Sequence, residues 1–288
     1  MRSSKRGAAG NGGPAEVYDP IARFYDLDHA GFEDDLEFYR QFARASPGPI
    51  LDIGVGTGRV AAPLARDGRH IVGVDISRQM LARAKRRLSQ EGVAERVTLV
   101  EADAASFVSS QRCGLALFTL NTFSHMLRLP EQMAALTNVR RHLLPGGRLL
   151  IDQWNPHASS APDSSGQWVF GYRRQDVDGR WVMQSVSSVA EPSEQILQTT
   201  VVYDEELPFR TERRRARRAK GNVGRPTATP RRTVVSLQLR YFYRFEVEWL
   251  LLASGYELEV VFGTYDLDLY TTGAPRLIWL ARNSVQSE

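Results

Sequence analysis

A glycine-rich turn is the feature of this sequence best suited to bind a ligand. Segment 51–58 reads LDIGVGTG, in which a short apolar run leads directly into three glycines. Glycine tolerates positive φ and has no Cβ, so a ligand can approach the backbone of such a turn closely. In a parallel α/β sheet, a turn between a strand and the following helix lies at the carboxyl edge, where ligands bind.

Two acidic residues follow the next two predicted strands. Asp75 ends the strand predicted over 70–75 and lies 19 residues after Gly56. A carboxylate at this place can accept hydrogen bonds from both hydroxyls of a ribose. Asp103 follows the strand predicted over 96–101, where it can accept a hydrogen bond from the exocyclic amine of an adenine. The turn and the two acids together predict a site for an adenosine-containing ligand.

The same turn argues against two other kinds of nucleotide site. Dinucleotide-binding turns carry G-x-G-x-x-G, whereas Arg59 stands at the third glycine position here. The turn also lacks the G-K-[ST] sequence of a P-loop. An NAD(P)-dependent dehydrogenase and a phosphate-cradling NTPase are therefore disfavoured.

Strand-like and helix-like segments alternate over the first half of the chain. Two helices broken near Gly31 are expected within 16–45, before the first strand. The alternation that follows predicts an α/β fold whose parallel sheet is covered by helices on both faces. The predicted strands are 50–53, 70–75, 96–101, 114–120 and 148–154, and the predicted helices include 58–66 and 130–143.

The pattern changes in the second half of the chain. Alternating strand-like runs at 168–173, 181–190, 195–203 and 233–243 predict an antiparallel β meander. A helix over 244–254 and strands over 256–263 and 276–281 then complete the α/β unit. We therefore expect a disordered tail at 1–15, an α/β domain made of 16–160 and 244–283 with an N-terminal helical lid, and a β insertion at 165–243.

These motifs resemble those of the class I S-adenosylmethionine-dependent methyltransferases. The resemblance rests on LDIGVGTGR (51–59), VGVDIS (72–77), VEADA (100–104) and LLPGGRLLID (143–152). It implies a seven-stranded, mostly parallel Rossmann-like sheet of order 3-2-1-4-5-7-6 with helices on both faces, and S-adenosyl-L-methionine as cofactor. Within the family, the N-terminal tyrosines and the inserted β meander resemble small-molecule enzymes such as amino-sugar N-methyltransferases and glycine N-methyltransferase-like proteins.

The resemblance also assigns cofactor contacts residue by residue. Met80 is expected to flank the adenine, with packing in the core as the alternative. Tyr25 is expected near the methionine end, with lid packing as the alternative, and Asp52 either braces the turn or contacts the methionine ammonium. The full set of expected cofactor contacts is Tyr25, Asp52, Gly54, Gly56, Gly58, Asp75, Ile76, Met80, Asp103, Ala104, Leu120 and Asn121.

Methyl transfer from a sulfonium is an in-line displacement, so such a protein must position the acceptor and remove its proton. His125, in the loop after the fourth strand, is the best candidate for the base because imidazole titrates near neutral pH. The alternative is that His125 only braces its loop. His29 and His157 are weaker candidates.

Aromatic and basic residues outside the cofactor motifs are candidates for the acceptor pocket. Arg240 or the neighbouring Arg244 could pair with an acidic acceptor. Packing between strands and a structural salt bridge are the alternatives for these residues. The expected acceptor contacts are Tyr18, Trp154, Arg240, Tyr241 and Tyr243.

The basic charge of the protein is concentrated in one segment. The chain carries +4, but residues 210–232 hold ten basic residues and one acidic residue, so this loop carries +9 and the rest carries −5. The loop could bind RNA, DNA or an anionic membrane, or be a solvated, disordered loop. We expect a small-molecule acceptor; the alternatives are an RNA or protein methyltransferase that uses 210–232 and a non-catalytic domain that binds the cofactor.

Composition excludes several other classes. Cys113 is the one cysteine, so an intramolecular disulfide is impossible and a thiolate metal cluster is disfavoured. No apolar run reaches the roughly 18 residues of a membrane span. We expect a cytoplasmic protein that holds no metal, with the β meander as the surface for a homodimer.

Overall fold

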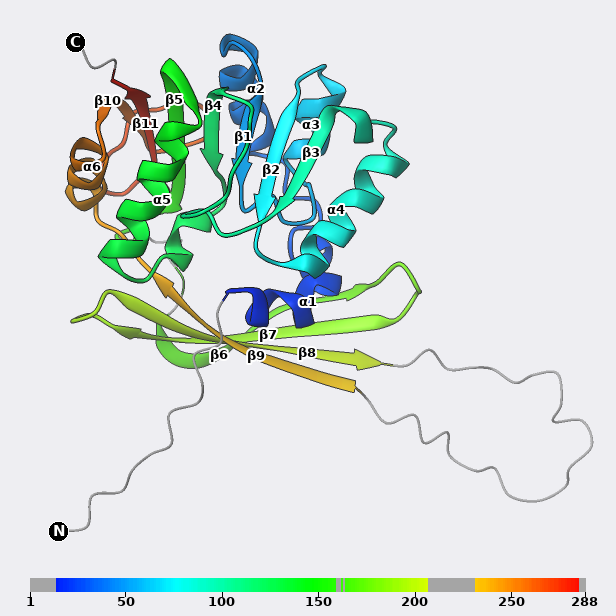
Figure 1. Ribbon diagram of the computed structural model, residues 1–288. Helices are drawn as coiled ribbons and strands as arrows, with labels where there is room; N and C mark the ends of the chain where they lie inside the picture. The colour runs from blue at the N-terminus through cyan, green and yellow to red at the C-terminus, as the bar shows by residue number, and fades with distance from the viewer. Residues whose placement is uncertain (1–13, 159–161, 163, 207–230, 285–288) are drawn as a thin grey trace, which may run out of the picture.

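The computed structural model describes residues 14–158, 162, 164–206 and 231–284. Two β-sheets lie one above the other in Figure 1, and helices surround the upper sheet. The predicted tail 1–15 and the basic loop 210–232 lie outside the described residues, except for residues 14, 15, 231 and 232.

The upper, central sheet has seven strands in the order β3-β2-β1-β4-β5-β11-β10. β1 pairs in parallel with β2 and β4, whereas β11 runs antiparallel to both β5 and β10. The predicted order 3-2-1-4-5-7-6 is therefore confirmed. The strands are β1 (Ile50–Ile53), β2 (Ile71–Asp75), β3 (Val97–Glu101), β4 (Cys113–Phe118), β5 (Leu143–Trp154), β10 (Tyr256–Phe262) and β11 (Arg276–Asn283).

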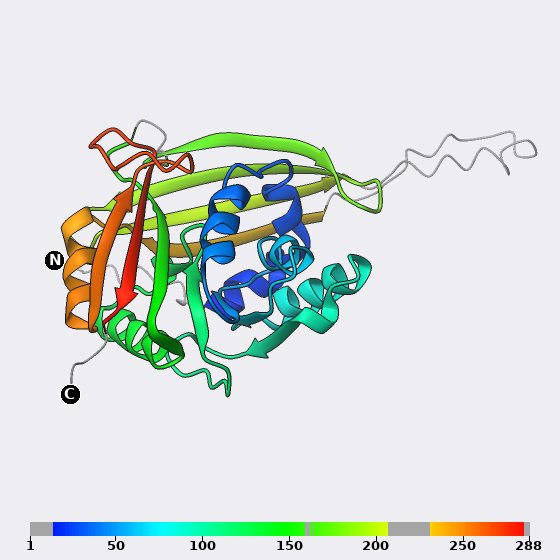
Figure 2. The ribbon, with the colours of Figure 1, turned by 90° about the horizontal axis from the view of Figure 1, so that it is seen from above.

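Helices cover both faces of the central sheet, as its buried strands require. Alternate residues of each strand enter different cores: Leu51 packs with α5 and α6, whereas Ile50 packs with α2, α3 and α4. Figure 2 shows α5 and α6 on one side of this sheet and α2 on the other. The helices are α2 (Leu36–Ala45), α3 (Ala61–Arg66), α4 (Arg78–Gln90), α5 (Leu129–Arg141) and α6 (Arg244–Ala253), with short 3-10 turns η1 (Ala94–Arg96) and η2 (Thr122–His125).

The lower sheet is the predicted antiparallel meander, formed between β5 and α6 in the chain. Its four strands pair in sequence order, β6-β7-β8-β9. The sheet lies across the carboxyl ends of the central parallel strands (Figure 1). Its strands are β6 (Ser165–Gln175), β7 (Trp181–Glu191), β8 (Ile196–Glu206) and β9 (Arg231–Arg240).

Two element boundaries differ from the sequence prediction. The helix predicted from residue 58 begins at Ala61, so Pro63 lies in its first turn, where its missing N–H breaks no helical hydrogen bond. The strand predicted over 233–243 ends at Arg240, and Tyr243 becomes the N-cap of α6.

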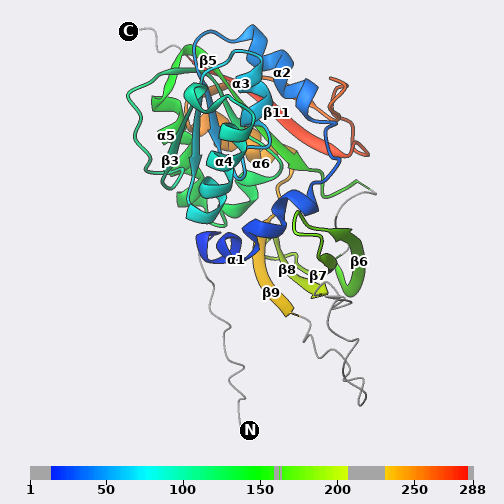
Figure 3. The ribbon, with the colours of Figure 1, turned by 90° about the vertical axis from the view of Figure 1, so that its right-hand side faces the viewer.

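Helix α1 (Pro14–Asp28) lies between the two sheets (Figure 3). Its apolar face packs on the meander, where the Phe24 ring stacks on Tyr203 with 4.2 Å between ring centroids. At its end, the Asp28 carboxylate accepts hydrogen bonds from the hydroxyls of Tyr172 (2.6 Å) and Tyr203 (2.7 Å) and from the amide of Gln184 (3.0 Å). This one side chain therefore fixes the helix on three strands, β6, β7 and β8.

Removing the Asp28 carboxylate should destabilise the protein. In Asp28→Ala, the two tyrosine hydroxyls and the Gln184 amide lose their acceptor in a partly buried place, which costs about 2–4 kcal/mol of the free energy of unfolding. Urea unfolding measures the change. Asp34→Ala, at an exposed position beyond the same helix, should change the free energy by less than about 0.5 kcal/mol. Equal stability of the two variants would contradict this account of how α1 is held.

Candidate functional site

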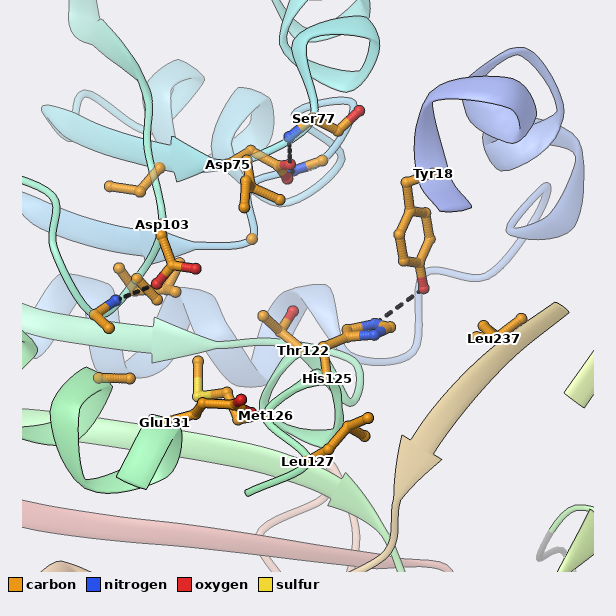
Figure 4. Close-up of a pocket in the computed structure, with 18 of the residues that line it drawn as sticks. Tyr18, Asp75, Ser77, Asp103, Thr122, His125, Met126, Leu127, Glu131 and Leu237 are labelled. Carbon is orange, nitrogen blue, oxygen red and sulfur yellow. Dashed lines mark hydrogen bonds between the residues drawn. The ribbon is translucent and has the colours of Figure 1, made fainter. Parts of the chain in front are cut away.

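A cavity of about 880 Å³ opens where the central parallel strands end. Its walls come from the glycine turn, the ends of β2 and β3, the segment after β4, the first turns of α5, helix α1 and strand β9. Figure 4 shows Asp75 and Asp103 on one side of this cavity and Tyr18 and Leu237 on the other, with His125 between them.

The glycine turn forms the floor of the cavity. Gly54 and Gly56 line it with φ of +71° and +55°, a backbone conformation that favours glycine. A Cβ on Gly54 would lie 2.5 Å from Cγ2 of Thr122, so only glycine permits this approach of two loops. Gly58 has φ of +78° but faces Ala84 of α4, which makes it a packing glycine outside the cavity.

Asp75 lies at the end of β2, as predicted, with its carboxylate at the cavity wall. It accepts hydrogen bonds from the backbone N–H of Gly56 (2.8 Å) and of Ser77 (2.8 Å), one on each oxygen. Burial raises the pKa of this carboxyl, and these two N–H groups oppose the rise. Each oxygen keeps a lone pair for a further donor. Two adjacent hydroxyls are the donors that such a carboxylate suits.

The residues around Asp75 form the rest of this end. Asp103 accepts a hydrogen bond from the N–H of Ala105 (2.7 Å) through one oxygen, and it lines the cavity with Ala104. Ile76 and Met80 line the same end with apolar side chains. This pattern, two carboxylates beside an apolar surface, suits the ribose and the base of a nucleoside.

The opposite end carries a partly buried pair, Tyr18 and His125. The Tyr18 hydroxyl and Nε2 of His125 share a hydrogen bond of 3.0 Å, and their rings meet edge to face at 5.1 Å. Burial lowers the pKa of His125 to about 4, so its imidazole is neutral at pH 7. Burial also raises the pKa of Tyr18, so its hydroxyl keeps its proton. The pair is uncharged at neutral pH.

Tyr25 also lines the cavity from α1. Its ring lies 3.8 Å from the place where a Cβ on Gly56 would stand. Burial raises the pKa of its hydroxyl to about 12. His29 stacks behind this ring, with 4.3 Å between centroids, and lies outside the cavity lining.

Several residues predicted to bind the acceptor lie outside the lining. The Arg240 guanidinium donates to Glu246 (2.8 Å) and to Gln195 (3.0 Å), which is the structural salt bridge named as its alternative. Trp154 packs on Tyr241 with 5.9 Å between ring centroids. Also outside the lining are Tyr243, Arg244, His157, Asn121 and Asp52.

The sequence analysis missed residues that tertiary contacts bring to the cavity. Leu237 enters from β9, and its place depends on how the meander lies over the central sheet. Thr122 could have been suspected, because it follows the fourth strand and so lies at the same sheet edge as the glycine turn. No spacing rule, however, distinguishes it from its neighbours in that loop. The other missed lining residues include Ser77, Ser106, Met126, Leu127, Arg128, Glu131, Gln198, Ser236 and Gln238.

Two further features were searched for in the described part of the chain. No group of three or more His, Cys, Asp or Glu side chains there is arranged to hold a metal ion. No helix among the described residues is long and apolar enough to cross a membrane.

Comparisons with known proteins identify the central part of the chain. Residues 50–147 match the family described as "Methyltransferase domain". The chain is 43% identical over 113 residues to the Escherichia coli K12 protein named "Uncharacterized protein YjhP", covering 38% of this chain and 44% of that protein. It is 34% identical over 145 residues to the "Ubiquinone/menaquinone biosynthesis C-methyltransferase UbiE" of Syntrophotalea carbinolica, covering 47% of this chain and 58% of that protein. The chain thus spans about half the length of these curated relatives.

Solved structures share the fold over almost the whole chain. The CcbJ methyltransferase of Streptomyces caelestis superposes with a TM-score of 0.75 at 23% identity, covering 93% of this chain and 98% of that one. The sugar N-methyltransferase KedS8 of Streptoalloteichus superposes with a TM-score of 0.71 at 20% identity, covering 99% of both chains. At these identities the likeness establishes the fold.

The family match, the seven-stranded sheet and the turn at its carboxyl edge agree on one class. Residues 50–147 are similar to a methyltransferase domain, and the strand order and the turn are those expected of the class I S-adenosylmethionine-dependent methyltransferases. The cofactor of such domains is S-adenosyl-L-methionine, as the sequence predicted.

The residues present fit this cofactor. Asp75 and Asp103 offer acceptors for the ribose hydroxyls and the adenine amine. Asp52 is fully buried, and neither of its carboxylate oxygens has a hydrogen-bond partner among the described residues. Burial raises the pKa of this carboxyl to about 7. A buried carboxylate without a partner needs a donor or a positive charge nearby. The cationic, hydrogen-donating end of a ligand at the glycine turn would supply it, directly or through water.

Asp75→Ala should weaken cofactor binding. Losing two hydrogen bonds to a charged acceptor should raise the Kd for S-adenosylhomocysteine about 10–100-fold, measured by calorimetry. Glu101→Ala is the matched control, because Glu101 pairs with Asp75 in the register of β2 and β3 but lies outside the cavity lining. Binding by Asp75→Ala as tight as the wild type would refute the ribose role.

His125 should stay neutral well below pH 7. With a folded pKa near 4 and an ordinary value near 6.5, the unfolded chain takes up a proton between these pH values that the folded protein does not. This residue therefore lowers stability as pH falls from about 6.5 to 4. NMR titration of the imidazole, assigned with His125→Gln, measures the value directly. A midpoint above pH 6 would contradict the burial of this ring.

Proposed function

We propose that this protein transfers the methyl group of S-adenosylmethionine to a small-molecule acceptor, and that the acceptor atom is an amine nitrogen. The observation that supports this most is the cavity itself: carboxylates for a nucleoside stand at one end, and an uncharged Tyr18–His125 pair stands at the other. The same proposal assigns cofactor binding to 16–160 and 244–283 and the cover of the acceptor to 165–243.

The division of labour in the reaction follows from this arrangement. The cofactor, when bound, supplies a methyl group on a sulfonium whose thioether is already the leaving group. Asp75, Asp103 and the glycine turn hold its nucleoside part, so the methyl would point toward the Tyr18–His125 end. The chain's main contribution is then to align the acceptor with the methyl group, since displacement requires a near-linear approach.

The lowered pKa of His125 favours nitrogen over other acceptors. A neutral imidazole with a pKa near 4 is a weak base for removing a proton from a hydroxyl or from carbon. An amine already has a free lone pair in its neutral form, so it needs orientation and, after transfer, loss of one proton. His125 and the Tyr18 hydroxyl can orient an N–H group, and the neutral imidazole of His125 can pass that proton on to solvent.

The surroundings of this end support a small acceptor. Helix α1 and strand β9 close over it, with Tyr18, Leu237 and the β9 residues Ser236 and Gln238 in the lining. The mixture of apolar and hydroxyl or amide groups suits a polar, uncharged skeleton such as a sugar. Solved proteins of the same fold include a sugar N-methyltransferase and an amino pentose methyltransferase.

Three sequence predictions remain proposals. RNA or protein as acceptor would rest on 210–232, which lies almost wholly outside the described residues. A homodimer would use the outer face of the meander, where Trp168, Phe170 and Val189 on β6 and β7 are each more than half exposed. A cytoplasmic location also stays a prediction.

Substituting the two residues should separate their roles. In a panel of amino sugars and small amines, with release of S-adenosylhomocysteine as readout, His125→Ala should lower turnover about 10²-fold because the acceptor loses its base and anchor. Tyr18→Phe should lower it about 10-fold, as one neutral hydrogen bond is lost. His157→Ala is the matched control, since His157 is exposed and outside the lining.

Three outcomes would count against the proposal. Near-normal turnover by His125→Ala would reduce this residue to bracing its loop. Activity on total RNA that disappears when 211–230 are deleted would favour the nucleic-acid alternative. Absence of cofactor binding by the wild-type protein would reject the enzyme altogether.

A further inference from the structure

The segment that carries His125 has a strained backbone. In residues 119–126, named here the His125 segment, Leu120 and Asn121 are consecutive non-glycine residues with φ of 40° and 66°. Side chains of L residues rarely adopt positive φ, and such a conformation persists only where surrounding contacts hold it. The same segment supplies Leu120, Thr122, His125 and Met126 to the cavity.

Three successive residues at the end of β5 hold this segment. The backbone N–H of Asn121 donates to the carbonyl of Asp152 at 2.9 Å. The N–H of Trp154 donates to Oδ1 of Asn121 at 2.7 Å. The hydroxyl of Ser124 donates to Oε1 of Gln153, and both of these side chains are buried. The segment is therefore tied to β5 at the strained Asn121 and again at Ser124.

The Asp152 carboxylate is the centre of these contacts. It is fully buried and accepts from Nε (2.8 Å) and Nη2 (2.5 Å) of Arg276 and from the hydroxyls of Tyr39 (2.5 Å) and Tyr265 (2.9 Å). The N–H of Leu120 reaches the same carboxylate at 3.4 Å. These partners come from α2, from the segment between β10 and β11, and from β11 itself. Each of them lies more than 100 residues from Asp152 in the chain.

Arg276 also touches the segment directly. Its Nη2 donates to Oδ1 of Asn121 at 3.4 Å, beside the stronger bond that Asn121 receives from Trp154. The cationic guanidinium compensates the buried Asp152 charge, and the two tyrosine hydroxyls satisfy its remaining lone pairs. Asp152, Arg276, Tyr39 and Tyr265 all lie outside the cavity lining.

We propose that Asp152, Arg276, Tyr39 and Tyr265, named here the Asp152 cluster, are positioning residues that hold the His125 segment in its strained conformation and so aim His125 at the acceptor. They touch neither ligand; they act through Leu120 and Asn121. The inference deepens the proposed function and rests on it for the role of His125. The loop conformation itself can be tested without the reaction.

The test uses tyrosine hydroxyls, because their removal leaves the rings and the core packing in place. Tyr39→Phe/Tyr265→Phe takes two donors from Asp152. Tyr256→Phe is the matched control: this tyrosine is buried like Tyr39, and its hydroxyl donates to the carbonyl of Leu136 in α5 at 3.0 Å, away from β5. The readouts are amide hydrogen exchange in 119–126, the NMR resonance of the His125 ring, and the Kd for S-adenosylhomocysteine.

The double variant should increase amide exchange in 119–126 about 10–100-fold and shift the His125 resonance, because two hydrogen bonds to a buried carboxylate are lost. The Kd for S-adenosylhomocysteine should rise severalfold, since Leu120 and Thr122 line its cavity. Tyr256→Phe should change neither the amide exchange in 119–126 nor the His125 resonance, even if its melting temperature falls as much as that of the double variant.

The proposal would be overturned if the amide exchange in 119–126 and the His125 resonance of the double variant matched those of the wild type. It would also be overturned if they changed no more than in Tyr256→Phe. If the double variant does not fold, Tyr265→Phe alone replaces it, with a smaller increase expected in the same peptide. Failure of the wild-type protein to bind S-adenosylhomocysteine would reject the proposed function, whereas the exchange of 119–126 would still report on the Asp152 cluster.

Discussion

Three carboxylates on helix α1 fix the relation between the two sheets, and the cavity exists because of that relation. Asp28 is bound by the meander, while Asp19 accepts from the hydroxyl of Ser77 and from the N–H of Gln79 at the start of α4. Asp26 accepts from Arg87 of α4 at 2.8 Å. Buried or partly buried carboxylates must find donors, so the helix cannot shift without losing several of them at once. Its remaining face then overhangs the ends of the parallel strands.

Enclosure by this helix sets the ionisation of the groups inside. The rings of Tyr18 and His125 are largely shielded from water, which favours their neutral forms and leaves a hydrogen-bonded pair in place of a charged one. Burial acts in the same direction on Asp52: it raises the pKa of this carboxyl to about 7, and the positive charge of Arg59 opposes the rise. A cationic group bound beside Asp52 would favour its ionised form further.

Sequence predictions were accurate where a feature depends on residues close together in the chain, and inaccurate where it depends on contacts between distant segments. The glycine turn, Asp75 and Asp103 could be located because the ends of neighbouring parallel strands share one edge, so chain order alone brings them together. The strand order itself was predicted only from the resemblance of four motifs to a known family. Four residues were assigned to the acceptor pocket because they lie where the meander joins the α/β domain: Trp154, Arg240, Tyr241 and Tyr243. There, however, Arg240 pairs with Glu246 and the aromatic rings pack on one another.

By itself, the sequence determined the class of the domain, its cofactor and the nucleoside end of the cavity, since each depends on residue type at a short, fixed distance from a strand end. The tertiary structure alone decided the other end. Which residues of β9 face the cavity depends on the pairing of the meander strands and on how α1 joins them to the central sheet. The strained turn at Leu120 and Asn121 depends on a buried Asp152 whose side-chain partners each lie more than 100 residues from it in the chain. Contacts of that range leave no spacing pattern, because they are formed only when the whole fold brings the partners together.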